Sequence, residues 1–394
     1  MCSKLKSLGI YIHWPWCKTI CPYCDFNVKK FEEIDTDTWL KAYIKEIKNI
    51  SLFTNLKEVK SIYFGGGTPS LISAEFIEKV INFISNNFSI SSSVEITIEA
   101  NPSSTKYNNL YNFKLAGVNR ISLGVQSFNN RDLKFLGRDH DSYQAKKAIK
   151  HINTLFNKAN FDIIYGIPDQ KISTFKKELN EIFNFAQSLG HLSIYQLTIE
   201  PRTPFYKLLK SGKLNLPSEE KLSDMYFMIQ EISERYKLPQ YEISNHSTFG
   251  HESIHNLGYW RYNQYLGIGP GAHSRVSKNS NRMSLIQIKS PKEWLNAVIK
   301  DTNGIANKEI LSKNEAAMEV LITGLRLKEF LPNDRFNQFS KLKLEEIIEK
   351  PLIKGLIEEG LIESKKSKIR TTSKGKAVLN SILYRFDKVI NSNY

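Results

Sequence analysis

The segment CKTICPYC at residues 17–24 spaces three cysteines as C-x3-C-x2-C, directly behind the apolar segment Gly9–Trp14. Thiolates of Cys17, Cys21 and Cys24, in a loop that follows a strand, can bind three irons of a 4Fe-4S cubane. The fourth iron then stays open to a ligand that carries an amino group and a carboxylate. A zinc site with His13 as a fourth ligand is the alternative metal centre, because zinc prefers four tetrahedral ligands. Buried cysteines without a metal are the third interpretation.

Outside this segment the composition is that of an ordinary folded protein. The chain has 394 residues, 41% of them apolar and 24% charged, enough for one large domain and a smaller one. Three of its four cysteines are clustered, which indicates a metal site rather than disulfides, and we interpret Cys2 as a non-ligand. No run approaches the roughly 18 apolar residues of a membrane helix, and no apolar region follows the N-terminal lysines. We therefore expect a cytoplasmic protein.

From residue 9 to about residue 240, short apolar segments alternate with amphipathic helical patterns. In Ala74–Phe88, for example, apolar residues recur at three- and four-residue spacing, which places them on one buried face. Six strand–helix units in succession predict a parallel sheet, since parallel strands need crossover connections. Polar and Gly-rich loops follow the strands, as at the catalytic rim of a parallel barrel. The predicted strands are Gly9–Trp14, Lys60–Gly65, Val94–Ala100, Arg120–Gln126, Phe161–Gly166 and Leu192–Glu200.

Three regions follow from these patterns. Residues 1–240 are expected to form the α/β region, a partial (β/α)6 barrel of the TIM type. Residues 241–304 are a less regular extension, dense in Gly, His and aromatic residues. Residues 305–394 are expected to form a C-terminal α+β module that resembles a winged helix. Its predicted elements are helices at 312–327 and 342–349, an apolar stretch at 352–361, a hairpin around the turn 365–368 and a last helix at 374–386.

The cysteine motif, with Tyr23 just before its third cysteine, is similar to that of radical-SAM proteins. The resemblance implies a 4Fe-4S cluster held by three cysteines and exchangeable S-adenosylmethionine (SAM) on the fourth iron. Electron transfer from the reduced cluster to the sulfonium would then cleave a C–S bond and generate a 5′-deoxyadenosyl radical. Gly65–Pro69, behind the second predicted strand, resembles the segment that binds the methionyl amino group. Glycines there permit close approach of the backbone and offer N–H donors.

Polar residues at further strand ends resemble, in order and spacing, the coproporphyrinogen-oxidase-like branch of the radical-SAM family. In that branch the matching positions contact one SAM on the cluster and, in the oxidase, a second beside it. By this resemblance Tyr11, Tyr23 and Glu99 surround the cluster-bound SAM. The residues matching the second position are Gly66, Gly67, Thr68, Gln126, Arg138 and Asp162.

The branch contains the oxygen-independent coproporphyrinogen III oxidases and the HemW-type haem chaperones, and the chain is more similar to the second class. The oxidase continues its motif with a further cysteine two positions on, where this chain has Phe26. The motif also begins at residue 17, which leaves no room for the N-terminal extension of the oxidase. His255–Trp260, HNLGYW, matches the H-N-x-x-Y-W signature of the chaperones. We expect a haem chaperone without coproporphyrinogen oxidase activity; the oxidase is the alternative.

Within that signature, the resemblance links His255 to haem binding. Imidazole is a natural axial ligand of haem iron, and aromatic neighbours can stack on a porphyrin. Without the resemblance, a histidine beside two aromatics is more often a hydrogen-bonded structural residue. His246, His251 and His273 are reserve candidates for the ligand.

The expected partners are haem, an unidentified haem acceptor protein and a low-potential electron donor such as a flavodoxin or ferredoxin. Peripheral membrane contact and a homodimer remain open. The net charge is +15, but the lysines are spread over the whole sequence. The predicted C-terminal hairpin carries Lys365, Lys366, Lys368 and Arg370, which would suit nucleic acid; we interpret them as a solvated loop and expect no nucleic acid partner.

Overall fold

The computed structural model describes residues 7–56, 58–278, 281–300, 303–366 and 368–391, so Cys2 lies outside the described residues. Within these ranges a twelve-stranded sheet has the order β14-β13-β12-β11-β1-β4-β5-β6-β7-β8-β10-β9. Its middle consists of six parallel strands that succeed one another in the sequence, which confirms the predicted α/β barrel. These strands are β1 (Ser7–Trp14), β4 (Glu58–Gly66), β5 (Ser89–Ala100), β6 (Arg120–Gln126), β7 (Lys158–Tyr165) and β8 (His191–Gln196).

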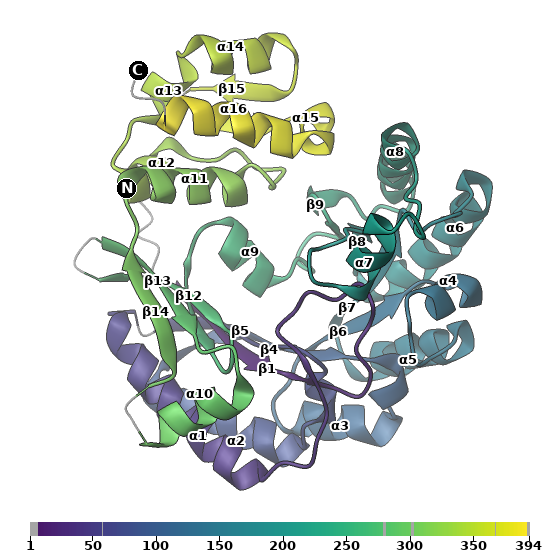
Figure 1. Cartoon of the computed structure of the whole chain (residues 1–394), viewed down its shortest axis with the longest axis vertical. Coiled ribbons are helices and arrows are strands. Elements are labelled where there is room, and N and C mark those ends of the chain that lie inside the picture. The colour runs from purple at the N-terminus through teal and green to yellow at the C-terminus, as the bar shows by residue number, and fades with distance from the viewer. Residues whose placement is uncertain (1–6, 57, 279–280, 301–302, 367, 392–394) are drawn as a thin grey trace.

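Amphipathic helices connect the parallel strands and lie around the outside of the curved sheet (Figure 1). In the helix over residues 74–87, Ser73 caps the first turn by accepting from Phe76 N. Its apolar side chains at three- and four-residue spacing are buried against the sheet. The helices are α1 (Thr36–Ile50), α2 (Ala74–Asn87), α3 (Tyr107–Leu115), α4 (Asn130–Phe135), α5 (Ser142–Leu155), α6 (Ile172–Leu189), α7 (Pro204–Lys210) and α8 (Glu219–Arg235).

Strands from later in the chain widen the sheet on both sides. On one side β11 pairs in parallel with β1, and three antiparallel pairs continue the sheet to β14. On the other side β10 pairs antiparallel with β8 and then with β9. The barrel therefore stays open between its two edges. These strands are β9 (Gln240–Glu242), β10 (Asn245–Ser247), β11 (Gln264–Ile268), β12 (His273–Lys278), β13 (Asn281–Gln287) and β14 (Ile305–Ile310), with helix α10 (Pro291–Lys300) between the last two.

The C-terminal elements form most of a second hydrophobic core, to which Tyr262 also contributes, and this confirms the predicted α+β module. They lie at one end of the molecule, and helix α9 (Ile254–Trp260) lies between them and the sheet (Figure 1). The elements are α11 (Lys313–Gly324), α12 (Asn333–Ser340), α13 (Leu344–Ile348), α14 (Pro351–Glu358), the hairpin of β15 (Ile362–Lys365) and β16 (Lys368–Thr371), α15 (Ser373–Ala377) and α16 (Leu379–Asn391).

Several element boundaries differ from the prediction; β5, for example, begins at Ser89 rather than Val94. Strand β8 ends at Gln196 rather than Glu200, because its partner strand β7 ends at Tyr165, the residue paired with Gln196. The last predicted helix is broken at Val378, where φ is −123°. After the break, α16 buries Leu379, Ile382 and Phe386 in the C-terminal core.

No helix in the described ranges combines the length and the apolar character needed to cross a membrane.

Candidate functional site

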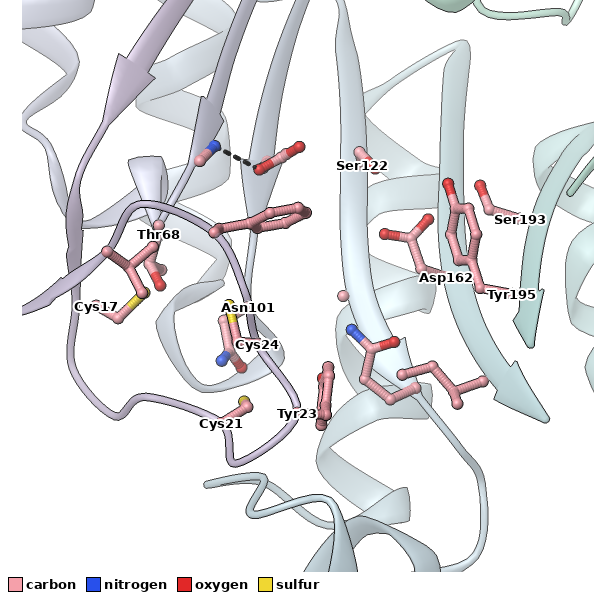
Figure 2. A pocket seen from close by; sticks show the side chains of 18 of the residues that line it. Cys17, Cys21, Tyr23, Cys24, Thr68, Asn101, Ser122, Asp162, Ser193 and Tyr195 are labelled. Carbon is pink, nitrogen blue, oxygen red and sulfur yellow. Dashed lines mark hydrogen bonds between the residues drawn. The ribbon is translucent and has the colours of Figure 1, made fainter. Parts of the chain in front are cut away.

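The carboxyl ends of the parallel strands surround a cavity of about 400 Å³, here called the cysteine cavity (Figure 2). The cysteine loop forms one wall, and strands β6 to β8 form the opposite wall. All predicted cluster and SAM residues except Tyr11 line it: Cys17, Cys21, Tyr23, Cys24, Gly66, Gly67, Thr68, Glu99, Gln126, Arg138 and Asp162. Residues that are more than 140 positions apart in the sequence therefore meet at one place.

Backbone hydrogen bonds fix the start of the cysteine loop at the end of β1. Gly67 N donates to Trp14 O (2.7 Å), and Thr68 N donates to Trp16 O (2.8 Å). On the other side, Phe31 N donates to Cys17 O (2.8 Å). The indole rings of Trp14 and Trp16 are buried and pack against each other with centroids 4.7 Å apart. The loop is thus anchored before its first cysteine.

The donor set fits a cubane cluster. The Cys17, Cys21 and Cys24 thiols are free and line the same cavity. Among the described residues, no three or more His, Cys, Asp and Glu side chains are arranged around a single ion; a cubane has no need of such convergence, because each cysteine binds a different iron. Arg138 Nη1 donates to Cys21 Sγ (3.3 Å), which places a cation beside the thiolates.

Burial governs the acid–base behaviour of this cavity. It raises the pKa of the Cys24 thiol to about 11 and also raises the pKa of Cys17. It raises the pKa of Glu99 to about 7, although the carboxylate accepts from Tyr63 Oη and from Gly66 N, both at 2.9 Å. Burial likewise raises the pKa of Asp162 to about 6. Near neutral pH these two carboxyl groups can therefore bind or release a proton.

The glycine segment has a packing role that the sequence does not reveal. A Cβ at Gly67 would lie 2.5 Å from Trp16 O, and one at Gly66 would lie 2.5 Å from the His13 ring. The N–H groups of Gly66, Gly67 and Thr68 are all bonded within the protein. The expected N–H donors to a ligand are thus engaged already, and these glycines allow the cysteine loop to approach β4.

Several residues that line the cysteine cavity were not predicted from the sequence. Ser193 and Tyr195 lie on β8, Ser122 on β6 and Asn160 on β7. Asn160 Nδ2 donates to the Asp162 carboxylate (3.0 Å). The alternation of side chains along a strand could have identified these residues, because every second residue points to the same face. Such sets are residues 122, 124 and 126 on β6, residues 160 and 162 on β7, and residues 193 and 195 on β8.

His255 and Tyr11 lie outside the cysteine cavity. His255 is 2% exposed, and both ring nitrogens are bonded, Nδ1 with Ser61 Oγ (2.9 Å) and Nε2 with Tyr259 Oη (2.8 Å). Burial lowers the pKa of His255 to about 3. The ring lies at the level of Gly9, about 16 Å along β1 from Trp14 at 3.3 Å per residue. As an iron ligand, His255 would have to give up one of these bonds.

Tyr11 and the reserve histidines are placed as follows. Tyr11 Oη bonds with His13 Nδ1 (2.9 Å) and faces a second cavity, which also touches Glu99. His246 is buried with neither ring nitrogen bonded, and burial lowers its pKa to about 3. His251 Nδ1 bonds with Leu189 O (3.2 Å). His273 is exposed and faces the second cavity.

Comparisons with known proteins agree with this geometry. The family model described as the Radical SAM superfamily matches residues 11–182, and the HemN C-terminal domain model matches residues 311–378. "Heme chaperone HemW" of Escherichia coli (strain K12) is 33% identical over 386 residues, 97% of this chain and 99% of the relative. "Radical S-adenosyl methionine domain-containing protein 1, mitochondrial" of Danio rerio is 34% identical over 343 residues, 86% of this chain and 77% of the relative.

Among solved structures, the coproporphyrinogen III oxidase (HemN) of Escherichia coli superimposes with a TM-score of 0.79. The two chains are 21% identical, and the match covers 97% of this chain and 90% of the other. At this identity the match confirms the fold, including the barrel and the C-terminal module.

Proposed function

The chain belongs to the radical SAM superfamily and, within it, to the family of its HemW relatives, and we propose that it is a haem chaperone, which binds haem and passes it to acceptor proteins. The observation that carries this proposal is the similarity to HemW proteins along nearly the whole chain. Phe26 supports it, because a large apolar side chain, 62% exposed, stands where the oxidase class has a further cysteine.

We assign the cluster to Cys17, Cys21 and Cys24, with SAM in the cysteine cavity beside Tyr23, Glu99 and the other matching positions. When bound, the reduced cluster supplies an electron of low potential, which a flavodoxin or ferredoxin would provide. The residues of this chain contribute binding and orientation. Arg138 offsets thiolate charge, and Glu99 holds or releases a proton beside Gly66 N.

The cluster assignment is tested by Cys21→Ser with Cys2→Ser as the matched control. Both proteins are reconstituted anaerobically, and their iron, sulfide and visible absorption are measured. Cys21→Ser should lose most of its cluster, whereas Cys2→Ser should match the wild type. A normal cluster in Cys21→Ser would overturn the metal assignment.

The chaperone proposal is tested on the same reconstituted protein in two assays. Haem titration should show saturable binding, and holo-protein should pass haem to an apo-haemoprotein added as acceptor. Incubation with coproporphyrinogen III, SAM and a low-potential reductant should yield no decarboxylated porphyrinogen by mass spectrometry. Turnover of coproporphyrinogen III would make the protein an oxidase despite Phe26.

A further inference from the structure

The wall of the cysteine cavity that lies opposite the cysteine loop carries Asp162, on β7 (Figure 2). A carboxylate that is partly withdrawn from water usually has an ion-pair partner, because desolvation of a charge is unfavourable. Within the described residues no ion pair engages Asp162. The guanidinium group of Arg138 donates instead to Cys21 Sγ (3.3 Å) and to Gly124 O (2.7 Å). When ionised, Asp162 therefore presents to the cavity a negative charge that a ligand can pair with.

The side-chain amide of Asn160, two residues earlier on the same strand, is bonded to this carboxyl group. Asn160 Nδ2 lies 3.0 Å from Asp162 Oδ1, and 2.9 Å and 3.2 Å from the hydroxyl oxygens of Ser122 and Ser193. An asparagine side chain offers a donor NH2 group on one side and an acceptor oxygen on the other. The NH2 group stabilises an ionised carboxylate, whereas the amide oxygen would stabilise a protonated carboxyl group. The orientation of this amide therefore influences the charge of Asp162.

Arg120, on β6, selects the orientation of the Asn160 amide. Arg120 Nη2 donates to Asn160 Oδ1 (3.2 Å), and a guanidinium group has donors only, so a flipped amide would place two donors against each other. Arg120 is itself fixed, because its Nη1 lies 3.7 Å from the Glu95 carboxylate and donates to His251 O (3.1 Å). Arg120 and Asn160 are both buried. The amide is thus held with its NH2 group towards Asp162.

The surroundings of Asp162 act on its pKa in both directions. Burial raises this pKa to about 6, and the largest opposing effects are the hydrogen bonds from Ser193 and Asn160, ahead of the charges of the two arginines. Loss of the Asn160 donor should therefore raise the pKa of Asp162 further. Both neighbouring tyrosines are neutral at pH 7, since burial raises the pKa of each. The titratable and charged groups that face Asp162 are Tyr63 on β4, Glu99 on β5, Arg120 on β6, Arg138 after α4 and Tyr195 on β8.

We propose that Asn160, oriented by Arg120, is a positioning residue that keeps the Asp162 carboxylate ionised, so that it receives a positively charged group of the ligand in the cysteine cavity. The chemical class of that group is a sulfonium or an ammonium cation, and SAM carries both. This inference rests on the proposed function, which puts SAM in the cysteine cavity. It adds the two residues, neither of which has to touch the ligand, that set the charge of the acceptor.

Two substitutions at Asn160 test the inference. Asn160→Leu removes the donor and adds no titratable group, so the pKa of Asp162 should rise by about one unit or more. Asn160→Asp keeps the size of the side chain and an acceptor for Arg120, and it covers the case in which Asn160→Leu does not fold. Adjacent carboxyl groups share a proton, so this pair should bind a proton at a higher pH than Asp162 does in the wild type. The same two changes at Asn108, which is exposed in the first turn of α3 and lines neither cavity, are the matched controls.

The charge of Asp162 is measured by infrared difference spectroscopy on full-length, cluster-reconstituted protein. Carbon-13 in the aspartate carboxyl groups separates their protonated band from that of Glu99, and the band of Asp162 is the one that Asp162→Asn loses. In the wild type this band should be half developed near pH 6, the pKa of Asp162 being about 6. The Asn108 variants should match the wild type.

The affinity for SAM, measured by calorimetry on the same proteins, should follow the charge of Asp162. An ionised Asp162 favours a cationic ligand, so the affinity should rise as the pH rises through the pKa of Asp162. At pH 7, Asn160→Leu should therefore bind SAM roughly twofold or more weakly than the wild type, and the difference should shrink towards about pH 9. Glu99 titrates in the same range in every variant, so the difference between variants is the quantity that reports on Asp162. Iron content and circular dichroism show whether each variant is folded.

The outcomes separate this inference from the proposed function. If the infrared band titrates in the folded Asn160 variants as it does in the wild type, the inference is wrong and the proposed function stands. If the band shifts but the affinity for SAM equals that of the wild type at every pH, Asp162 does not receive the cation and the inference is again wrong. If the wild type binds no SAM, the assignment of SAM to the cysteine cavity fails and the inference fails with it, while haem titration still tests the chaperone role.

Discussion

Glu99 is a buried residue whose charge should change near neutral pH. Its folded-state pKa of about 7 is above the ordinary value of 4.5 because the carboxyl group is buried. The folded state therefore binds this proton more tightly than the unfolded state. The contribution to stability is complete below about pH 4.5 and is lost as the pH rises through 7.

Glu99→Gln should remove this dependence, because the amide resembles the protonated carboxyl at every pH. Relative to the wild type, the variant should gain unfolding free energy between pH 5 and pH 8, by about 3 kcal/mol at most. Urea denaturation at both pH values measures the gain. Glu78→Gln, on the exposed face of α2, is the control and should show no such gain; an equal gain in both variants would contradict the assignment to Glu99.

Gly67 should tolerate no side chain. In Gly67→Ala the new Cβ would meet two carbonyl oxygens, Trp16 O at 2.5 Å and Trp14 O at 2.9 Å. Backbone atoms give way poorly, so we expect a loss of about 1–3 kcal/mol in stability and a lower iron content after reconstitution.

The control for Gly67→Ala is Gly355→Ala in α14, where the nearest atom would be 3.9 Å from the new Cβ. It should leave the cluster unchanged and stabilise the protein by up to about 1 kcal/mol. Full iron content in Gly67→Ala would show that the loop can move away from β4.

At the scale of single residues, the sequence shows which side chains could bind a metal or a ligand, but it does not show their hydrogen-bond partners. The three cysteines, Glu99 and Asp162 stand out because their types and spacing suit a metal or a ligand. The engagement of His255 could not be predicted, because Ser61 lies 194 residues away in the sequence. The tertiary fold alone supplies the hydrogen-bond partners of a histidine such as His255.

Helix α9 depends on a buried ion pair beneath its first turn. The Glu95 carboxylate accepts from the N–H groups of Ile254 and His255, both at 3.0 Å, and Arg120 lies 3.7 Å from it. Both side chains are 1% exposed. The pair orients the helix that carries Tyr259 and Trp260.

Removing one partner of this ion pair should lower the stability of the protein. Glu95→Gln should destabilise the protein by about 3–5 kcal/mol, because Arg120 would keep an uncompensated buried charge. The double variant Glu95→Gln/Arg120→Met should lose less than the sum of the two single variants in urea denaturation. Strict additivity would show that the two groups act independently.

Among the secondary-structure elements, those with strong hydrophobic periodicity could be predicted from the sequence, whereas the long-range pairing of strands could not. Helix α2 and the six parallel strands follow from local pattern, because each buries one face or runs through the core. The end of β8 depends on where β7 ends, and the addition of β11 to β1 joins residues about 256 positions apart. Such long-range pairing cannot be predicted from local sequence patterns.

For the whole molecule, the excess of 15 positive charges should not produce binding to nucleic acid. In the C-terminal hairpin, Arg370 pairs with Glu363 (2.7 Å), and in α16 Arg385 pairs with Glu359 (2.7 Å). Because these two arginines are paired and the lysines are spread over the whole sequence, we expect few phosphate contacts. A labelled DNA duplex should therefore show no saturable change in fluorescence anisotropy at about 150 mM salt, roughly physiological ionic strength. Saturable binding would contradict this expectation if the logarithm of its association constant fell linearly with the logarithm of the salt concentration.

Phe26, Gly66 and Glu99 line both the cysteine cavity and the second cavity, so the two cavities share a wall. Residues that touch two ligands at once cannot adjust to one of them without altering the free energy of the other. If a ligand in one cavity changes the affinity for a ligand in the other by some factor, the second ligand must change the affinity for the first by the same factor. The occupancy of one cavity would then be measurable as a change in the affinity of the other, even though no ligand spans both.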